Sequence, residues 1–205
     1  FKKVKYVYDH AFELNLDDED LRLTQETYNK FIKNGSLLDN DQKIALREID
    51  KELSALKPKF TQNLLNATKQ YELHINDHKK VQGISDSVLE IAKAKTKEKD
   101  KEGWVFTLDA PVYTPVMTNA KDRVIREKMY RAFNSRANGG EFSNKNILKR
   151  IVTLRNKRAK LLGFDSHAHY MLQNRMAQTP EKVNDFIEDL FTKSMPKAKK
   201  ELDDI

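Results

Sequence analysis

Residues 41–66, DQKIALREIDKELSALKPKFTQNLLN, carry the pattern that decides the fold. Apolar residues recur there at intervals of three or four: Leu46, Ile49, Leu53, Leu56, Phe60 and Leu64. This spacing places them on one face of an α-helix. Pro58 lies inside the pattern and predicts a kink or a break, because proline lacks a backbone N–H and clashes with the preceding turn. The stretch therefore predicts a long amphipathic helix.

Similar patterns predict helices over most of the chain. Acidic residues at 17–20 and Gly35 mark the start and the end of a helix over residues 17–34, with Leu21 among its inward positions. Further helices are predicted at residues 86–103, 124–138, 143–162, 166–172 and from Pro180 onward. The segment Pro111–Pro115 predicts a rigid connection, because it holds two prolines in five residues.

Two short segments alternate apolar and polar residues and predict strands, at residues 71–75 and 104–108. The 28 residues between them include a helix, which favours a parallel crossover over a tight hairpin. The chain has only six glycines and five prolines, too few turn signals for a sandwich or barrel. The predicted fold class is mainly α: one multi-helix segment over residues 1–205, with a small two-stranded β element and a possible subdivision near residues 109–120.

The 205 residues contain no cysteine, which excludes disulfides, thiolate metal sites and a cysteine nucleophile. No apolar run approaches the roughly 18–20 residues that a membrane span requires, and the first 30 residues lack the pattern of a signal peptide. Both the cytoplasm and the periplasm stay open as compartments. The chain starts at Phe1 and stops inside a helical pattern, so we expect it to be a segment of a longer protein, its parent protein.

The histidines offer weak candidates for a metal site. His74 and His78 have the four-residue spacing of a zinc peptidase helix, but Ile75 stands where the catalytic glutamate belongs, and a strand is predicted there. His167 and His169 are two residues apart at the start of a short helix, so they point in different directions. Surface positions for the first pair and packing or capping for the second are the expected roles.

Positive charge is concentrated in one part of the chain. Residues 119–160 contain 13 Lys and Arg but 3 Asp and Glu, a net charge of +10 within a chain of net +7. The arginines of this region are Arg123, Arg126, Arg131, Arg136, Arg150, Arg155 and Arg158. They could bind nucleic-acid phosphate, peptide carboxylates or an acidic surface, or form structural ion pairs with neighbouring helices. Nucleic acid is disfavoured, because no turn-linked recognition helix is visible.

An ordered string of local patterns resembles the dipeptidyl carboxypeptidase branch of the thimet oligopeptidase family of zinc metallopeptidases. The patterns are FTQNLL (60–65), YEL (71–73), WVFTL (104–108), PVYTP (111–115), REKMYRAF (126–133), NGGE (138–141), LRNKRAKLLGF (154–164), SHA (166–168) and NRMA (174–177). Each is short, but their order and spacing together are fairly specific and span nearly the whole chain.

The resemblance implies a mostly helical peptidase with a deep channel, whose zinc is held by an H-E-x-x-H motif and a further glutamate. That motif is absent from this chain, so the resemblance assigns no catalytic or metal residue here. It implies a segment upstream of the zinc region that forms part of the channel wall, with zinc in the parent protein only. Its partners would be the rest of the peptidase and short peptides, with no membrane. Arg155 and Arg158 are the candidates to face the channel and favour anionic peptide ends.

A second hypothesis comes from a different class of protein. The basic helices would make this chain a stand-alone interaction module that binds an acidic protein or nucleic acid. Salt-dependent binding of the chain to an acidic partner would favour this alternative.

Overall fold

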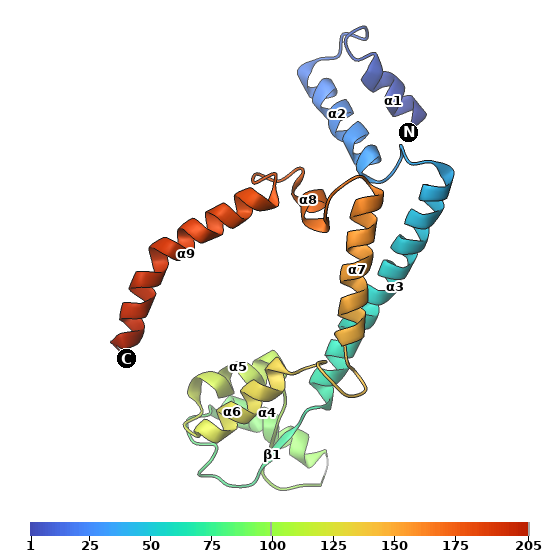
Figure 1. The fold of residues 1–205 in the computed structure, drawn as a ribbon. Coiled ribbons are helices and arrows are strands. Elements are labelled where there is room, and N and C mark those ends of the chain that lie inside the picture. Colours follow the sequence, from blue (N-terminus) through green and yellow to red (C-terminus); the bar gives the residue numbers. More distant parts are fainter. Residues whose placement is uncertain (99, 205) are drawn as a thin grey trace. The chain divides into compact units, whose positions relative to one another are not determined.

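The computed structural model describes residues 1–98 and 100–204, and within them it contains nine α-helices and one two-stranded sheet (Figure 1). In chain order the elements are α1 (Lys2–Asp9), α2 (Asp18–Lys33), α3 (Asn40–Gln70), β1 (Leu73–Ile75), α4 (Asp86–Lys97), β2 (Trp104–Phe106), α5 (Ala110–Asn119), α6 (Arg123–Asn134), α7 (Lys145–Leu161), α8 (His167–Leu172) and α9 (Pro180–Asp203). The predicted fold class, mainly α with a small β element, is confirmed.

The chain forms two compact units. Unit 1 combines Phe1–Leu53 with the segment from Val152 onward, and unit 2 is the contiguous stretch Ser54–Ile151. Both boundaries fall inside helices, the first in α3 and the second in α7. The predicted stretch for a subdivision, residues 109–120, holds α5 of unit 2, and a subdivision there stays a prediction.

In unit 2, β1 and β2 pair antiparallel, with Leu73 opposite Phe106 and Ile75 opposite Trp104. The prediction of a parallel crossover was therefore wrong. The connection contains α4, but the loops on either side of this helix are long enough to return the chain and reverse its direction. Gly103 makes the pairing possible, because its φ is +89° and a Cβ there would lie 2.3 Å from the carbonyl oxygen of Ile75.

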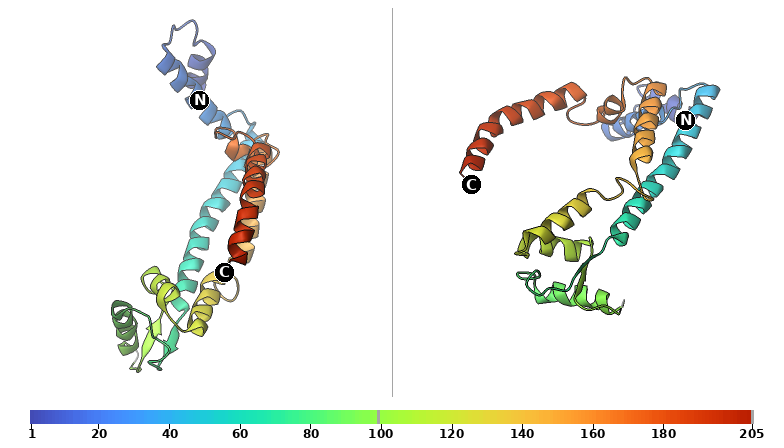
Figure 2. Two further views of the ribbon diagram at one scale, coloured as in Figure 1. Left: turned by 90° about the vertical axis from the view of Figure 1, so that its left-hand side faces the viewer. Right: turned by 60° about the horizontal axis from the view of Figure 1, so that its bottom comes forward.

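The main apolar core lies in unit 2, where α4 packs against β2 and α5 contacts both α4 and α6 (Figures 1 and 2). Phe106, Val116 and Met129 in this core are completely buried. The segment Pro111–Pro115 is not a connection but part of α5, because Pro111 occupies the first turn, where proline is tolerated. Val112 and Val116, one turn apart, supply the buried face of α5.

Polar contacts join the C-terminal half of α3 to the residues on either side of the α6–α7 turn in unit 2. Asn144, whose exposed fraction is 5%, donates from Nδ2 to the Phe60 carbonyl (2.9 Å) and accepts at Oδ1 from Asn63 Nδ2 (3.0 Å). Arg136 donates to the Thr68 hydroxyl (3.3 Å). These contacts fix the start of α7 against α3.

In unit 1, α1 and α2 form a helical hairpin, and Figures 1 and 2 show the two helices side by side. Tyr8 and Tyr28 stack with ring centroids 3.9 Å apart. Asp17 caps α2 by accepting from the Asp20 backbone N–H at 2.8 Å, as the acidic start predicted. Leu21 was predicted to face inward, but it is exposed at the start of α2.

Gly35 ends α2 with a φ of +87°, a left-handed conformation that glycine adopts at little cost. A Cβ at this position would lie 2.6 Å from Leu46 and 3.4 Å from Leu162. The missing side chain therefore lets the end of α2 approach the first turns of α3 and the end of α7 within unit 1.

Three of the described helices continue through an internal proline: Pro58 lies within α3, Pro115 within α5 and Pro196 within α9. A kink or a break was predicted at Pro58; the break does not occur, and the kink stays a prediction. Along α9 the predicted apolar positions are present at helical spacing, but none of the residues of this helix is buried. Those with a large exposed fraction are Phe186, Ile187, Leu190 and Phe191.

Candidate functional site

The first histidine pair is exposed on unit 2, which confirms the surface positions predicted from the sequence. His74 Nε2 lies 2.6 Å from the carbonyl oxygen of Glu102. The His78 ring meets Trp104 edge-on, with centroids 4.6 Å apart. The two imidazoles therefore have separate partners, and no acidic ligand accompanies them in the described contacts.

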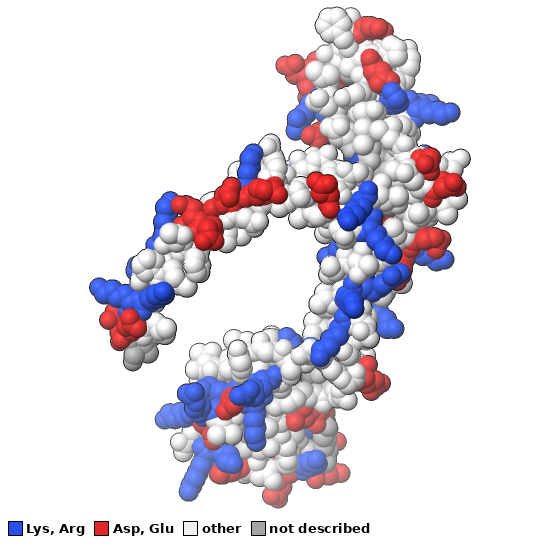
Figure 3. All heavy atoms as spheres, viewed as in Figure 1, with Lys and Arg blue, Asp and Glu red and all other residues white. Residues whose placement is uncertain are grey.

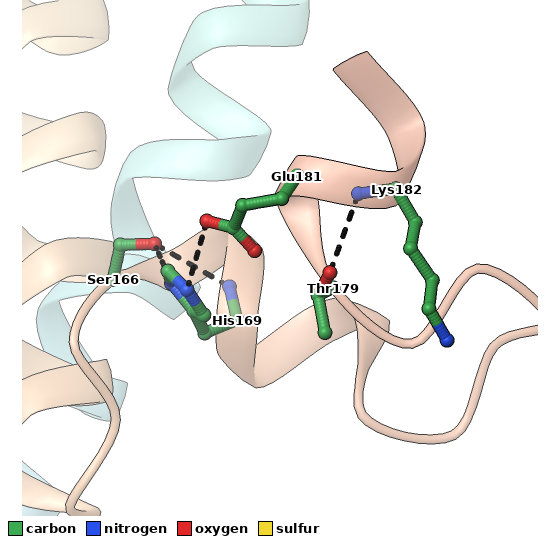
Figure 4. Close-up of polar contacts among 5 residues, drawn as sticks. All are labelled: Ser166, His169, Thr179, Glu181 and Lys182. Carbon is green, nitrogen blue, oxygen red and sulfur yellow. Dashed lines mark hydrogen bonds and ion pairs between the residues drawn. The ribbon is translucent and has the colours of Figure 1, made fainter. Parts of the chain in front are cut away.

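The second histidine pair lies where α8 approaches α9 in unit 1, and its rings have different neighbours. His167 lies over Tyr170, with ring centroids 6.1 Å apart. His169 Nδ1 lies 2.8 Å from Ser166 Oγ, and its Nε2 lies 3.7 Å from Glu181 (Figure 4). The packing role predicted for the pair is confirmed by His167, whereas the cap of α8 is Ser166, which accepts from the His169 backbone N–H.

Glu181, in the first turn of α9, is the charged partner of this junction. Hydrogen bonds from its own backbone N–H and from Thr179 lower the pKa of the Glu181 carboxyl, with a smaller contribution from His169. Thr179 also accepts from the backbone N–H of Lys182 at 3.3 Å and caps the helix (Figure 4). The side chains of Ser166, His169, Thr179 and Glu181 thus lie between α8 and α9. Their hydrogen bonds are those that cap the first turn of a helix.

Within residues 1–98 and 100–204, no group of three or more His, Cys, Asp or Glu side chains could hold a metal ion. A catalytic zinc needs three protein ligands and an open position. The residues described in this chain therefore do not fit the zinc centre that the resemblance implies for the parent protein. None of the described helices is long and apolar enough to cross a membrane.

Arg158, one of the two candidates for the channel, makes structural contacts in unit 1. Its Nε donates to Asp50 Oδ1 of α3 at 2.7 Å, and its guanidinium carbon lies 5.1 Å from the centre of the Tyr170 ring. Burial lowers the pKa of Arg158, but Asp50 and Tyr170 outweigh that effect and hold the pKa above its ordinary value. The exposed fraction of its side chain is 14%, which matches a residue that joins helices.

Arg155, the other candidate, lies one turn before Arg158 on α7 and is partly exposed. The structure places both residues on one helix of unit 1, whereas Arg123, Arg126 and Arg131 lie on α6 of unit 2. The basic region of the sequence is therefore divided between the two units.

A groove along α6 is a feature that the sequence did not reveal. Charge counting found its arginines, but Met117 and Tyr130, which line the same groove, gave no signal in the sequence. Their part in it depends on how α5 packs against α6.

Comparison with known proteins adds the family context. Residues 116–205 match the sequence profile of peptidase family M3. The chain is 35% identical over 199 residues to oligopeptidase A of Salmonella typhimurium, an alignment that covers 95% of this chain and 29% of that protein. It is 36% identical over 198 residues to a probable cytosolic oligopeptidase A of Arabidopsis thaliana, covering 93% of this chain and 28% of that protein.

Dipeptidyl carboxypeptidase of Escherichia coli is 30% identical over 204 residues, covering 98% of this chain and 30% of that protein. The chain thus spans about three tenths of the length of these relatives. It is related to the M3 metallopeptidases, and its described part contains no metal-binding group.

Proposed function

We propose that this chain is part of a zinc-dependent oligopeptidase of the M3 type that cleaves short peptides. The observation that carries the proposal is the similarity over nearly the whole chain, 35% identity across 199 residues, to oligopeptidase A of Salmonella typhimurium. The match of residues 116–205 to peptidase family M3 supports it independently of any single relative. The parent protein is thus the longer peptidase to which we assign this chain.

The chain contributes structure rather than the catalytic centre. Its described residues hold no metal-binding group, and His74 and His169 are hydrogen-bonded to Glu102 and Ser166. We therefore place the zinc ligands in another part of the parent protein. The two units of this chain would form part of the wall of the substrate channel, which admits extended peptides and excludes folded proteins.

Two kinds of cleavage are open to such a parent. The sequence patterns pointed to the dipeptidyl carboxypeptidase branch, which releases dipeptides from the carboxyl end. The identities of 34–36% with oligopeptidases A, against 30–31% with dipeptidyl carboxypeptidases, favour the oligopeptidase branch. We therefore propose internal cleavage of short peptides, with dipeptide release as the second candidate.

The exposed apolar side chains of α9 support a large partner. Phe186, Ile187 and Phe191 have exposed fractions above one half, although such residues are usually buried in a folded protein. The remainder of the parent peptidase is the partner that would cover this face.

The test compares the purified parent protein with the 205-residue chain, using two matched nine-residue peptides. One peptide has a free carboxyl terminus, and the other has an amidated terminus. We expect the parent to cleave both internally, to lose activity with a zinc chelator and to regain it with added zinc. We expect the chain alone to cleave neither peptide.

Mass spectrometry of the products separates the two branches. Release of successive dipeptides from the free carboxyl end, with the amidated peptide left intact, would assign the parent to the dipeptidyl carboxypeptidase branch. A parent that cleaves no peptide, or a chain that alone binds one zinc per molecule and hydrolyses peptides, would contradict the proposal.

The channel-wall role is tested in the parent protein at Arg155. Arg155→Glu should raise KM for peptides with a free carboxyl terminus and leave amidated peptides unchanged, because the charge acts on the anionic end. Lys157→Glu, an exposed neighbour on the same helix, is the matched control. Arg158 is unsuitable for this test, because reversing its charge would also break its ion pair with Asp50. Equal KM changes for the two peptides would contradict a channel position.

A further inference from the structure

A groove of about 410 Å³ runs along α6 in unit 2 and is lined mostly by long polar side chains. The lining residues are Met117, Arg123, Arg126, Glu127, Tyr130 and Arg131. Three of these six are arginines. Figure 3 shows Lys and Arg side chains gathered over the part of the molecule that holds α5 and α6. The groove is therefore a positively charged recess of the size of a few side chains.

Two of the arginines are held in place by the protein. Arg126 donates from one terminal nitrogen to the carbonyl oxygens of Ala120 and Lys121 at the end of α5. Arg131 donates from Nε to Glu127 Oε1 at 2.8 Å. A guanidinium has five N–H donors in a fixed fork, so these contacts orient each group while using only part of its donor capacity. Ligand binding would thus cost little additional ordering of Arg126, whereas the Arg131–Glu127 pair is largely exposed, with 76% of the arginine side chain open to solvent.

The start of α6 is capped by an acidic residue, because Asp122 accepts from the backbone N–H groups of Val124 and Ile125. Arg123 occupies the first position of the helix, and Arg126 follows three residues later, a spacing at which like charges repel. An anionic group bound between the two guanidinium groups would offset this repulsion.

The chemistry of the groove selects carboxylates on a peptide. Planar guanidinium groups bind carboxylates through paired hydrogen bonds. Tyr130, whose exposed fraction is 56%, and Met117 add apolar surface against which the methylene groups of glutamate side chains can pack. Binding of a single-stranded nucleic acid uses several stacking aromatic side chains along an extended track, whereas one aromatic residue lines this groove.

We propose that the α6 groove is a docking site for a glutamate-rich peptide segment, with Arg123, Arg126 and Arg131 binding its carboxylates. The inference does not depend on the proposed peptidase function, because the groove lies entirely in unit 2 and needs no zinc centre. If the chain binds acidic peptides but the parent protein has no peptidase activity, this inference stands and the proposed function fails.

The test uses a fluorescein-labelled peptide of eight glutamates and the 205-residue chain, with fluorescence anisotropy as the readout. We expect saturable binding that weakens as salt rises and no binding of the matched peptide of eight glutamines. Arg123→Glu should weaken binding by at least about fivefold, because it removes one exposed ion pair and adds repulsion. Lys93→Glu, an exposed change of the same charge on α4, should alter binding less than about twofold.

Equal weakening by Arg123→Glu and Lys93→Glu would overturn the proposal, because it would show attraction by net charge alone. Tighter binding of an eight-nucleotide single-stranded DNA through the same arginines would also overturn it in favour of nucleic acid. Arg123→Gln, which removes the charge without reversing it, provides a second variant with a smaller expected loss. Amide shifts on adding the unlabelled glutamate peptide should be confined to α6 and the end of α5, and shifts elsewhere in unit 2 would contradict the assignment.

Discussion

Arg158 of α7 and Asp50 of α3 are 108 positions apart in the sequence, and their side chains meet at 2.7 Å within unit 1. The arginine is largely buried, with 14% of its side chain exposed, while 46% of the aspartate side chain remains exposed. Tyr170 of α8 lies against the same guanidinium. One charged side chain thus joins three helices.

Arg158→Ala should therefore destabilise unit 1. The lost hydrogen bond to a charged partner and the lost packing on Tyr170 should cost about 1–3 kcal/mol. Hydrogen exchange of the α3 and α7 amides measures the change in the free energy of opening. Arg155→Ala, on the same helix, is the control and should change that energy by less than about 0.5 kcal/mol. Similar effects of the two changes would argue against the joining role of Arg158.

Asn144 should be similarly important in unit 2, because both ends of its amide form hydrogen bonds with α3 while its side chain is buried. Asn144→Ala leaves the Asn63 amide without this acceptor and should lower the free energy of unfolding by about 1–3 kcal/mol. Urea denaturation followed by circular dichroism measures the loss. Asn146→Ala changes an exposed residue two positions later and should be nearly neutral. A neutral Asn144→Ala would mean that the contacts add no net stability.

Gly83→Ala should be poorly tolerated. Gly83 has a φ of +87°, and a Cβ there would lie 2.2 Å from the carbonyl oxygen of Asn119. The left-handed conformation alone should cost about 1–2 kcal/mol for alanine, and the contact adds to it. Gly139→Ala is the matched control, because a Cβ at Gly139 meets nothing within 4 Å. Thermal unfolding should show a lowered Tm for Gly83→Ala only, and equal Tm values for the two variants would contradict the expectation.

The apolar face of α9 should cause the 205-residue chain to self-associate when it is separated from other proteins. Replacing Phe186 and Phe191 by serine should shift the chain toward monomer, since burial of each phenylalanine contributes about 1.5–3 kcal/mol. Sedimentation velocity over a range of concentrations measures the shift. Lys182→Ser on the same helix should leave the association unchanged. Association that persists in the double serine variant would place the contact elsewhere.

Much of the helical content could be predicted because its signals are local. Asp17 and Gly35 mark the ends of α2, and Ser166 marks the start of α8, each through a hydrogen bond or a backbone conformation that depends on a few neighbouring residues. Prolines were harder to interpret. Pro111 lies in the first turn of α5, where the backbone N–H has no partner within the helix, so no hydrogen bond is lost. Pro58 is exposed and lies inside the long helix α3, which continues past it.

The direction of β2 and the composition of the α6 groove could not be predicted, because both depend on contacts between distant residues. The chain enters β2 directly after Gly103, whose backbone lies close to the carbonyl oxygen of Ile75. The length of the connection between β1 and β2 does not determine this close contact. Charge counting located Arg123 and Arg158 in one basic region, but it could not separate an arginine that lines a groove from one that is paired with Asp50.

The division of unit 1 into two chain segments sets an order of folding during synthesis on the ribosome. Unit 2 is contiguous and can fold once Ile151 has emerged, whereas Leu46 must wait for Leu162 of the second segment. At roughly 5–20 residues per second, the interval between residues 53 and 152 lasts about 5–20 s. During that time Leu46 lacks its neighbour from the second segment, so transiently exposed apolar surface favours misfolding of the nascent chain until Leu162 has been made.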